Sequence, residues 1–282
     1  MVYLSEKQAD NHVIDPSSYS VEQDHLTVEV LSNGVVVVTL DHQEIRNAMG
    51  AQMTAAFGRL IDEIRQDSRP KCLVVTGAGS AFCSGGDKTW LEEEDHSPDD
   101  FRNKMMPFYR TWLGVTSLEI PVVAAINGPA VGAGAILALA ADLRVGSPRA
   151  KFCLPFLTLG MAPALGGSFL VKDVVGMAVA RDLIYTGRVI DAKRMYELNI
   201  ITELIEDDDF LGKAIDFASD IASRAPIATR LMKAGLFNGG PSTLEDALQW
   251  EGVAQATTLA TEDIIEGYRA SKDRRKPNFK GL

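Results

Sequence analysis

Two apolar runs that each end in a small-residue turn constrain the fold of this chain most strongly. The first run, Cys72–Val75, leads into the turn Thr76–Asp87, and the second, Pro121–Ile126, leads into the turn Asn127–Gly134. A short apolar run followed by glycines is typical of a buried strand that ends where the backbone must approach another group closely. Two such units can supply two converging N–H donors. The sequence therefore predicts a site built from main-chain donors at the ends of two buried strands.

Strand and helix patterns alternate along the first two thirds of the chain. The β-branched run Val35–Leu40 follows the hairpin pair Asn33-Gly34, and apolar residues recur at helical spacing from Met49 to Ile64. A second helical pattern covers Phe101–Leu113. Strands buried on both faces and joined by helices predict an α/β fold.

Helical patterns dominate from Gly166 onward. They predict a mainly helical last third, with helices at Phe169–Val175, Ala192–Leu198, Asp209–Ser223, Ile227–Phe237 and Leu244–Ala260. Three segments result: a polar, poorly ordered N-terminal tail (residues 1–24), an α/β core (25–205) and a helical C-terminal region (206–282). The second turn of the core is expected to lead into a helix from Ala135 onward.

Composition excludes several classes of function. The 282 residues carry a formal net charge of -10, which argues against nucleic acid or an anionic membrane as partner. The apolar stretch 121–143 is interrupted by Pro121, Asn127 and Pro129, so a buried strand, turn and helix explain it better than a membrane span. The three cysteines have no paired spacing and the N-terminus has no signal-peptide pattern, which favours reduced thiols and a cytoplasmic location. No nucleotide-binding glycine motif or metal-ligand spacing is visible.

Taken together, the two turns resemble those of the crotonase (enoyl-CoA hydratase/isomerase) superfamily, from about Leu26 to Leu282. The resemblance implies a spiral core of ββα units, with a C-terminal helical region that packs subunits into trimers or dimers of trimers. It also implies an acyl-CoA thioester as substrate, with coenzyme A as part of the substrate and no prosthetic group. In this family the two turns form an oxyanion hole, which here corresponds to the N–H groups of Gly86 and Ala133. Removing one such donor typically costs about 3 kcal/mol of transition-state stabilisation.

Further site residues follow from matching segments. Arg46-Asn47-Ala48 resembles the segment that lines the coenzyme A entrance, and residues 159–167 resemble the turn beneath the acyl pocket. The basic C-terminal tail resembles one that touches coenzyme A, sometimes from a neighbouring subunit. The residues expected to contact coenzyme A are Arg46, Ala48, Ser84, Asp87, Arg274 and Lys276, and those expected to line the acyl pocket are Ile136, Phe156 and Pro163.

The chain departs from the family at the two catalytic glutamates of the hydratases. Ile136 and Phe156 stand at those positions, and neither side chain can transfer a proton. The missing carboxylates favour decarboxylation, isomerisation or C–C cleavage over hydration. Decarboxylation needs only a stabilised enolate and one proton donor, because loss of carbon dioxide generates the enolate without a base, and Lys88 and Tyr109 are candidate donors. Each is also explained as an ordinary residue, Lys88 as a solvated loop lysine and Tyr109 as a packed helix aromatic. A hydratase with other catalytic groups and a non-catalytic acyl-CoA-binding scaffold remain alternatives.

Overall fold

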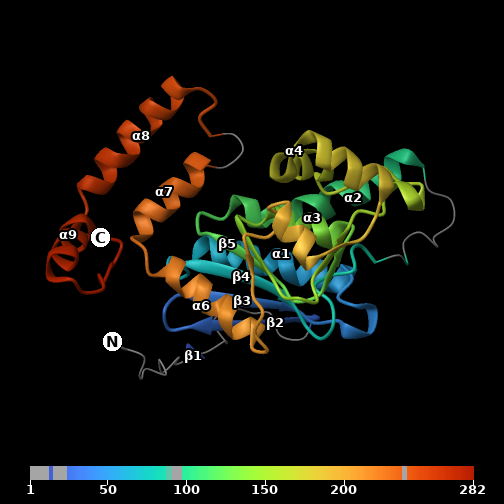
Figure 1. Cartoon of the computed structure of the whole chain (residues 1–282), viewed down its shortest axis with the longest axis horizontal. Coiled ribbons are helices and arrows are strands. Elements are labelled where there is room, and N and C mark those ends of the chain that lie inside the picture. The colour runs from blue at the N-terminus through green and yellow to red at the C-terminus, as the bar shows by residue number, and fades with distance from the viewer. Residues whose placement is uncertain (1–12, 15–23, 88, 90–96, 237–239) are drawn as a thin grey trace.

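The computed structural model describes residues 13–14, 24–87, 89, 97–236 and 240–282, and its centre is a seven-stranded sheet (Figure 1). The strands from β3 to β10 run parallel, and the first two are added antiparallel at one edge. Parallel neighbours need crossover connections, which the helices between the strands provide. The strand order is β1 (Val13–Ile14), β2 (Leu26–Leu31), β3 (Val35–Leu40), β4 (Cys72–Gly77), β5 (Val122–Ile126), β7 (Leu143–Gly146) and β10 (Glu203–Leu204).

The hairpin between β2 and β3 forms at the predicted pair. Gly34 adopts a φ of 87°, and its N–H donates to the carbonyl of Leu31 at 2.9 Å. The Asn33 side chain accepts from the N–H of Val35 at 3.1 Å. Val13–Ile14 pairs with β2, so the segment predicted as a tail contributes a short edge strand; residues 1–12 and 15–23 lie outside the described part of the chain.

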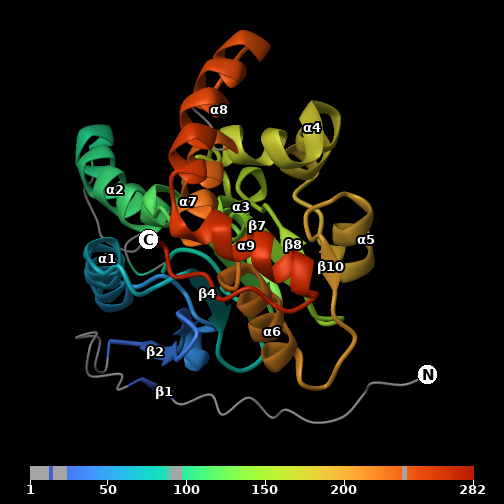
Figure 2. The ribbon, with the colours of Figure 1, turned by 90° about the vertical axis from the view of Figure 1, so that its left-hand side faces the viewer.

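Helices cover both faces of the sheet (Figures 1 and 2). One large apolar cluster joins one face to α1, α3 and the start of α4, and a smaller cluster joins the other face to α6. This arrangement confirms the α/β expectation, because the central strands are buried on both sides. The helices are α1 (Ala51–Gln66), α2 (Pro98–Trp112), α3 (Ala133–Ala140), α4 (Gly167–Thr186), α5 (Ala192–Glu197) and α6 (Phe210–Ala222), with 3-10 turns η2 (Gln43–Ile45), η4 (Leu113–Ser117) and η5 (Leu157–Leu159).

Two helices differ from their predicted bounds. The helix after the second turn begins at Ala133 rather than Ala135, because Gly132 caps it with a backbone conformation of φ 55° and ψ -120°. Helix α4 runs to Thr186, but it consists of two helical segments joined at the non-helical Gly176, so the first segment ends at Val175 as predicted. The second segment, which follows Gly176, was not predicted. It packs into the core through the buried Ala180 and Leu183.

A second, three-stranded sheet lies beside the main one. It is ordered β6 (Pro129–Val131), β8 (Lys151–Cys153) and β9 (Ile190–Asp191). Strand β6 follows β5 after only two residues, so the chain leaves the main sheet, enters the second sheet and then begins α3. This change of sheet sets the position of the second glycine turn.

Of the last three helices, the first packs against the body, where Lys233 pairs with Asp142 and donates to the carbonyl of Ile120, and the other two project from it (Figure 1). The three are α7 (Pro226–Leu236), α8 (Leu244–Leu259) and α9 (Glu262–Asp273), and α8 buries none of its side chains. Helix α6, in contrast, packs on β3, β4 and β5 through its alanine-rich face. The division of the chain at residues 24 and 205 stays a prediction. No helix in the described ranges is both long enough and apolar enough to cross a membrane.

Candidate active site

The first glycine turn folds back tightly at the end of β4. A methyl group built on Gly77 would lie 2.2 Å from the carbonyl oxygen of Ala81, so only glycine fits there. Beyond the turn the chain runs between the segments that contain Met49 and Val131. The N–H of Met49 donates to the carbonyl of Gly85 at 2.8 Å, and the N–H of Val131 donates to the carbonyl of Cys83 at 2.9 Å. The segment that carries Gly86 is therefore held from both sides by main-chain hydrogen bonds.

The second glycine turn positions the N-terminus of α3. Gly132 has a backbone conformation that side chains rarely adopt, and a methyl group built on it would meet no atom within 4 Å. Its N–H donates to the carbonyl of Cys153 at 2.9 Å, which fixes the turn to the second sheet. The next residue, Ala133, is the first of α3, and the N–H groups of a first helical turn have no intrahelical acceptor.

The fold brings the two turns into contact. A methyl group built on Gly85 would lie 2.9 Å from the carbonyl oxygen of Val131 and 3.4 Å from the nitrogen of Ala133. Across the described ranges, no acceptor lies within hydrogen-bond reach of the N–H of Gly86 or that of Ala133. The two donors thus lie on adjoining segments, beside the positive end of the α3 dipole. Such an arrangement can stabilise negative charge on an oxygen.

Of the predicted pocket residues, Ile136 and Phe156 are buried and Pro163 is partly buried. Ile136 is fully buried on α3, and a methyl group built on Gly167 would lie 3.0 Å from its Cδ1 atom and 3.6 Å from the Cβ atom of Pro163. Phe156 is also buried, just before η5. Leu165, in the turn that leads to α4, is fully buried with a φ of 53°. The structure places Ile136 and Pro163 together at the start of α4.

Four of the residues expected to contact coenzyme A lie on two adjoining segments. The hydroxyl of Ser84 donates to the carbonyl of Ile45 at 2.9 Å, and the N–H of Ser84 donates to the carbonyl of Arg46 at 3.0 Å. The N–H of Asp87 donates to the carbonyl of Met49, and Ala48 is buried between these contacts. The Arg46 side chain is exposed and follows η2 in a left-handed conformation.

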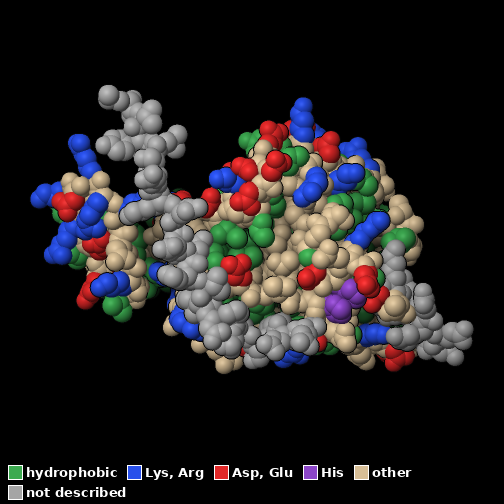
Figure 3. Space-filling model, turned by 90° about the horizontal axis from the view of Figure 1, so that it is seen from below, with side chains coloured by type: hydrophobic (Ala, Val, Ile, Leu, Met, Phe, Trp, Pro, Cys, Tyr) green, Lys and Arg blue, Asp and Glu red, His purple; other side chains and the backbone are tan. Residues whose placement is uncertain are grey.

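The two basic residues of the tail lie elsewhere. Arg274 ends α9 and Lys276 follows it, and Figure 1 shows α9 at the opposite end of the molecule from α2 and α4. Basic side chains gather at this end (Figure 3). Within one chain the structure does not bring the tail to the glycine turns.

The two candidate proton donors differ in what the structure describes. Tyr109 lies on α2, half-buried against the large apolar cluster, and burial raises the pKa of its hydroxyl, which therefore stays protonated at neutral pH. Lys88 lies outside the described residues. Over the described part of the chain, no group of three or more His, Cys, Asp or Glu side chains is placed to hold a metal ion.

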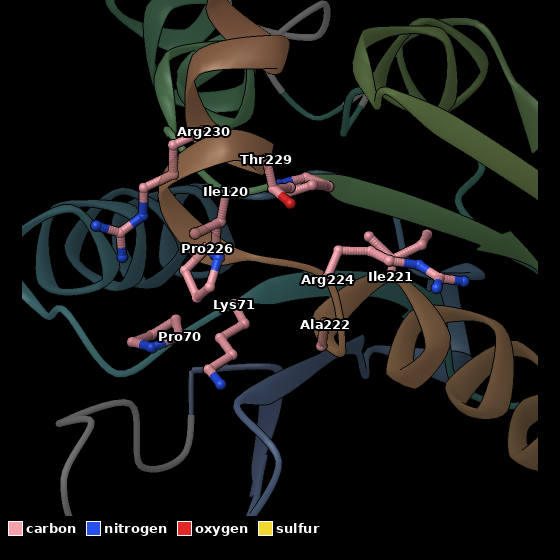
Figure 4. Close-up of a pocket in the computed structure, with 10 residues that line it drawn as sticks. Pro70, Lys71, Ile120, Ile221, Ala222, Arg224, Pro226, Thr229 and Arg230 are labelled. Carbon is pink, nitrogen blue, oxygen red and sulfur yellow. The ribbon is translucent and has the colours of Figure 1, made fainter. Parts of the chain in front are cut away.

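Two hollows on the molecule lie away from the glycine turns. Figure 4 shows a small one between the start of β4, the end of α6 and the start of α7, lined by residues that include Lys71, Ile120 and Arg230. A larger one, of about 560 Å³, lies between α4 and α7. Neither contains a residue predicted for the site.

Sequence reasoning assigned no role to two buried asparagines beside the turns. Asn47 is fully buried and Asn127 is 8% exposed, and both side chains donate to carbonyl groups of the first turn. The sequence did contain a sign of this role. Asn47 lies inside Arg46-Asn47-Ala48 and Asn127 begins the second turn, and both stand next to apolar residues that predict burial.

Comparison with known proteins agrees with the α/β fold described above. The family model described as enoyl-CoA hydratase/isomerase matches residues 31–282. A putative enoyl-CoA hydratase/isomerase from Bacillus subtilis is 32% identical over 92% of this chain and 99% of its own length. The 1,2-epoxyphenylacetyl-CoA isomerase of Escherichia coli is 30% identical over 89% of this chain and 97% of its own.

A solved structure extends the likeness to three dimensions. The crystal structure of an enoyl-CoA hydratase from Bacillus anthracis has a TM-score of 0.85 and 32% identity, and the match covers 92% of this chain and 100% of that one. The chain therefore belongs to the enoyl-CoA hydratase/isomerase family of the crotonase superfamily, whose members act on acyl-CoA thioesters.

Proposed function

We propose that the chain binds an acyl-CoA thioester with its carbonyl oxygen between the N–H groups of Gly86 and Ala133. The observation that carries this proposal is the contact between the two turns, with both donors directed at no acceptor in the described residues. When a bond at the α-carbon breaks, its electron pair delocalises onto the thioester oxygen, and two hydrogen bonds lower the energy of that enolate. Arg46, Ser84 and Asp87 are the proposed coenzyme A contacts, and their support is that they lie on two adjoining segments beside Gly86.

The proposed reaction is isomerisation, decarboxylation or C–C cleavage rather than hydration. The buried Ile136 and Phe156 support this choice, because neither can hold or activate water. In a decarboxylation, the C–C bond breaks, carbon dioxide leaves, and the enolate takes a proton at the α-carbon. Tyr109 is the proposed donor for that proton, since its hydroxyl stays protonated at neutral pH. The printed name of the Escherichia coli relative, an isomerase, supports the same range of reactions.

Hydration by other groups is the second candidate. It is favoured by the short-chain-enoyl-CoA hydratase of Clostridium acetobutylicum, which is 32% identical over 86% of this chain. In that case a residue other than those at positions 136 and 156 would activate the water.

The test is turnover of purified protein against enoyl, 3-oxoacyl, malonyl-type and aromatic CoA thioesters, followed by mass spectrometry. Loss of carbon dioxide, C–C cleavage or an isomerised product of unchanged mass supports the first proposal, and addition of water supports the second. Gly86→Pro, which deletes one donor, should abolish either activity. Binding without turnover in the unaltered protein would show a carrier or scaffold and overturn both.

We also propose that the chain assembles as a homotrimer or a dimer of trimers in the cytoplasm. Exposed apolar side chains on the projecting helices support a second copy as their cover, among them Leu248, Val253 and Tyr268. A neighbouring copy would also bring the tail, with Arg274 and Lys276, toward coenzyme A. The three free, buried cysteines are compatible with a reducing compartment. Sedimentation equilibrium tests the assembly, and a monomer at micromolar concentration would contradict it.

A further inference from the structure

Two buried asparagines donate hydrogen bonds to the carbonyl groups of the first glycine turn. The amide nitrogen of Asn47 donates to the carbonyls of Ala78 at 3.0 Å, Ala81 at 2.9 Å and Phe82 at 3.4 Å. The amide nitrogen of Asn127 donates to the carbonyls of Gly77 at 2.8 Å, Gly79 at 3.2 Å and Ala81 at 3.4 Å. Five carbonyl groups of one six-residue turn thus face two side-chain amides.

Both amide groups are also fixed at their oxygen atoms. The N–H of His42 donates to Oδ1 of Asn47 at 2.9 Å, and the N–H of Gly77 donates to Oδ1 of Asn127 at 3.3 Å. The backbone of Asn47 is left-handed, with a φ of 58°, which asparagine tolerates better than most residues. A buried amide with every partner in place has one orientation, and a substitution leaves several carbonyl groups without donors.

Each asparagine lies two or three residues before a residue that pairs with the segment 83–86. Met49, two residues after Asn47, pairs with Gly86 in a parallel bridge. Ala130, three residues after Asn127, pairs with Cys83 in a second parallel bridge. The strand after Asn127 continues through Gly132 into α3. Asn127 therefore also precedes the segment that carries Ala133.

We infer that Asn47 and Asn127 are positioning residues that together set the distance and direction between the N–H groups of Gly86 and Ala133. This inference rests on the proposed function, because it assigns the two donors to one thioester carbonyl. Neither asparagine touches the substrate in this account; each acts through the turn whose carbonyl groups it holds. A displacement of about 1 Å in a catalytic donor can lower a rate about 100-fold, so a modest shift of the turn has a large effect.

The experiment uses a chromophoric probe that reports polarisation of the thioester carbonyl. The conjugated chromophore of p-dimethylaminocinnamoyl-CoA absorbs at longer wavelength when its carbonyl oxygen accepts hydrogen bonds. The full chain is titrated with this probe, and the absorbance maximum and the Kd are recorded for the unaltered protein, Asn47→Ala and Asn127→Ala. We expect each variant to bind with a Kd within about threefold and to lose most of the red shift, while kcat on the preferred thioester falls about 10-fold to 100-fold.

Thr76→Val is the matched control. The buried Thr76 hydroxyl donates to the carbonyl of Ala125 at 2.9 Å across β4 and β5, directly before the turn, so its loss removes one buried hydrogen bond from the same strands. A purely structural role predicts that all three variants lose stability and keep the red shift. Positioning predicts that only the asparagine variants lose the shift.

The outcomes separate the inference from the function on which it rests. No red shift in the unaltered protein would overturn the oxyanion hole itself. A full red shift in both asparagine variants, with kcat within twofold of the unaltered protein, would overturn the inference alone. If an alanine variant does not fold, Asn47→Ser and Asn127→Ser take its place, because serine retains a hydroxyl of smaller reach. They are expected to show an intermediate shift, and an unchanged shift would overturn the inference.

Discussion

Deleting the N–H group of Ala133 is the most direct perturbation of the proposed oxyanion hole. Ala133 is the first residue of α3, where proline is favoured because the missing N–H has no intrahelical acceptor and the fixed φ suits a helix. Ala133→Pro should therefore remove one donor and change the free energy of unfolding by less than about 1 kcal/mol.

The expected effect on catalysis is large in comparison. Loss of one oxyanion-hole donor costs about 3 kcal/mol, so kcat should fall by about 10² to 10³. Ala133→Gly is the control, since it keeps the N–H and should retain kcat within about threefold despite a helix-propensity cost of about 1 kcal/mol.

Two measurements decide the outcome: steady-state kinetics on the thioester that turns over fastest, and affinity for an S-alkyl-CoA thioether. The thioether has no carbonyl, so equal affinity in Ala133→Pro and the unaltered protein would show that the ring leaves the rest of the site open. A proline variant that folds, binds the thioether and keeps its kcat would refute the assignment of Ala133 as a donor.

Three further predictions concern buried or paired ionisable groups. Lys233→Met should lower the free energy of unfolding in urea by about 2–4 kcal/mol, because the Lys233 ammonium, 7% exposed, lies 2.9 Å from Asp142 and its removal leaves that carboxylate without its partner; a loss below 0.5 kcal/mol, as in an exposed pair, would contradict it. Burial raises the pKa of Cys72 and Cys83 from 9.0 to about 12, so Ellman's reagent at pH 8 should react with neither until the protein unfolds, and the free energy of unfolding should fall above pH 9, where only the unfolded thiols ionise. Hydrogen bonds lower the pKa of Glu266 from 4.5 to about 2, so its support of the C-terminal tail is complete above pH 4.5 and is lost as the pH falls through about 2; hydrogen exchange should show a protected tail at pH 4 that Glu266→Gln exposes, and equal protection in both proteins would exclude this role.

Local sequence patterns account for much of the secondary structure. The hairpin at Asn33-Gly34, the strand Val35–Leu40 and the alternation of strand and helix were all predictable, because side-chain periodicity and glycine conformations act within a few residues. Helix bounds were less predictable where one glycine has an unusual conformation. Gly176 separates the predicted segment of α4 from a second helical segment that was not predicted, and Gly132 starts α3 earlier than the apolar pattern indicates.

The site itself was only partly visible in the sequence. Its two turns were recognisable by their glycines, and the apolar residues at positions 136 and 156 could be read directly. The roles of Asn47 and Asn127 were not recognisable, because a side-chain amide reveals its partners only when the chain brings them together. Asn47 bonds to a carbonyl 31 residues away and Asn127 to one 50 residues away.

By itself, then, the sequence determined that two buried strands end in glycine turns, that apolar side chains stand at positions 136 and 156, and that helices follow. Only the tertiary structure decided that the turn carrying Gly86 contacts the turn carrying Ala133, that α6 covers the sheet while α8 leaves the body, and that the basic tail lies far from the turns of its own chain. The physical reason is that strand order and the hydrogen bonds between distant segments depend on pairings that no local pattern encodes.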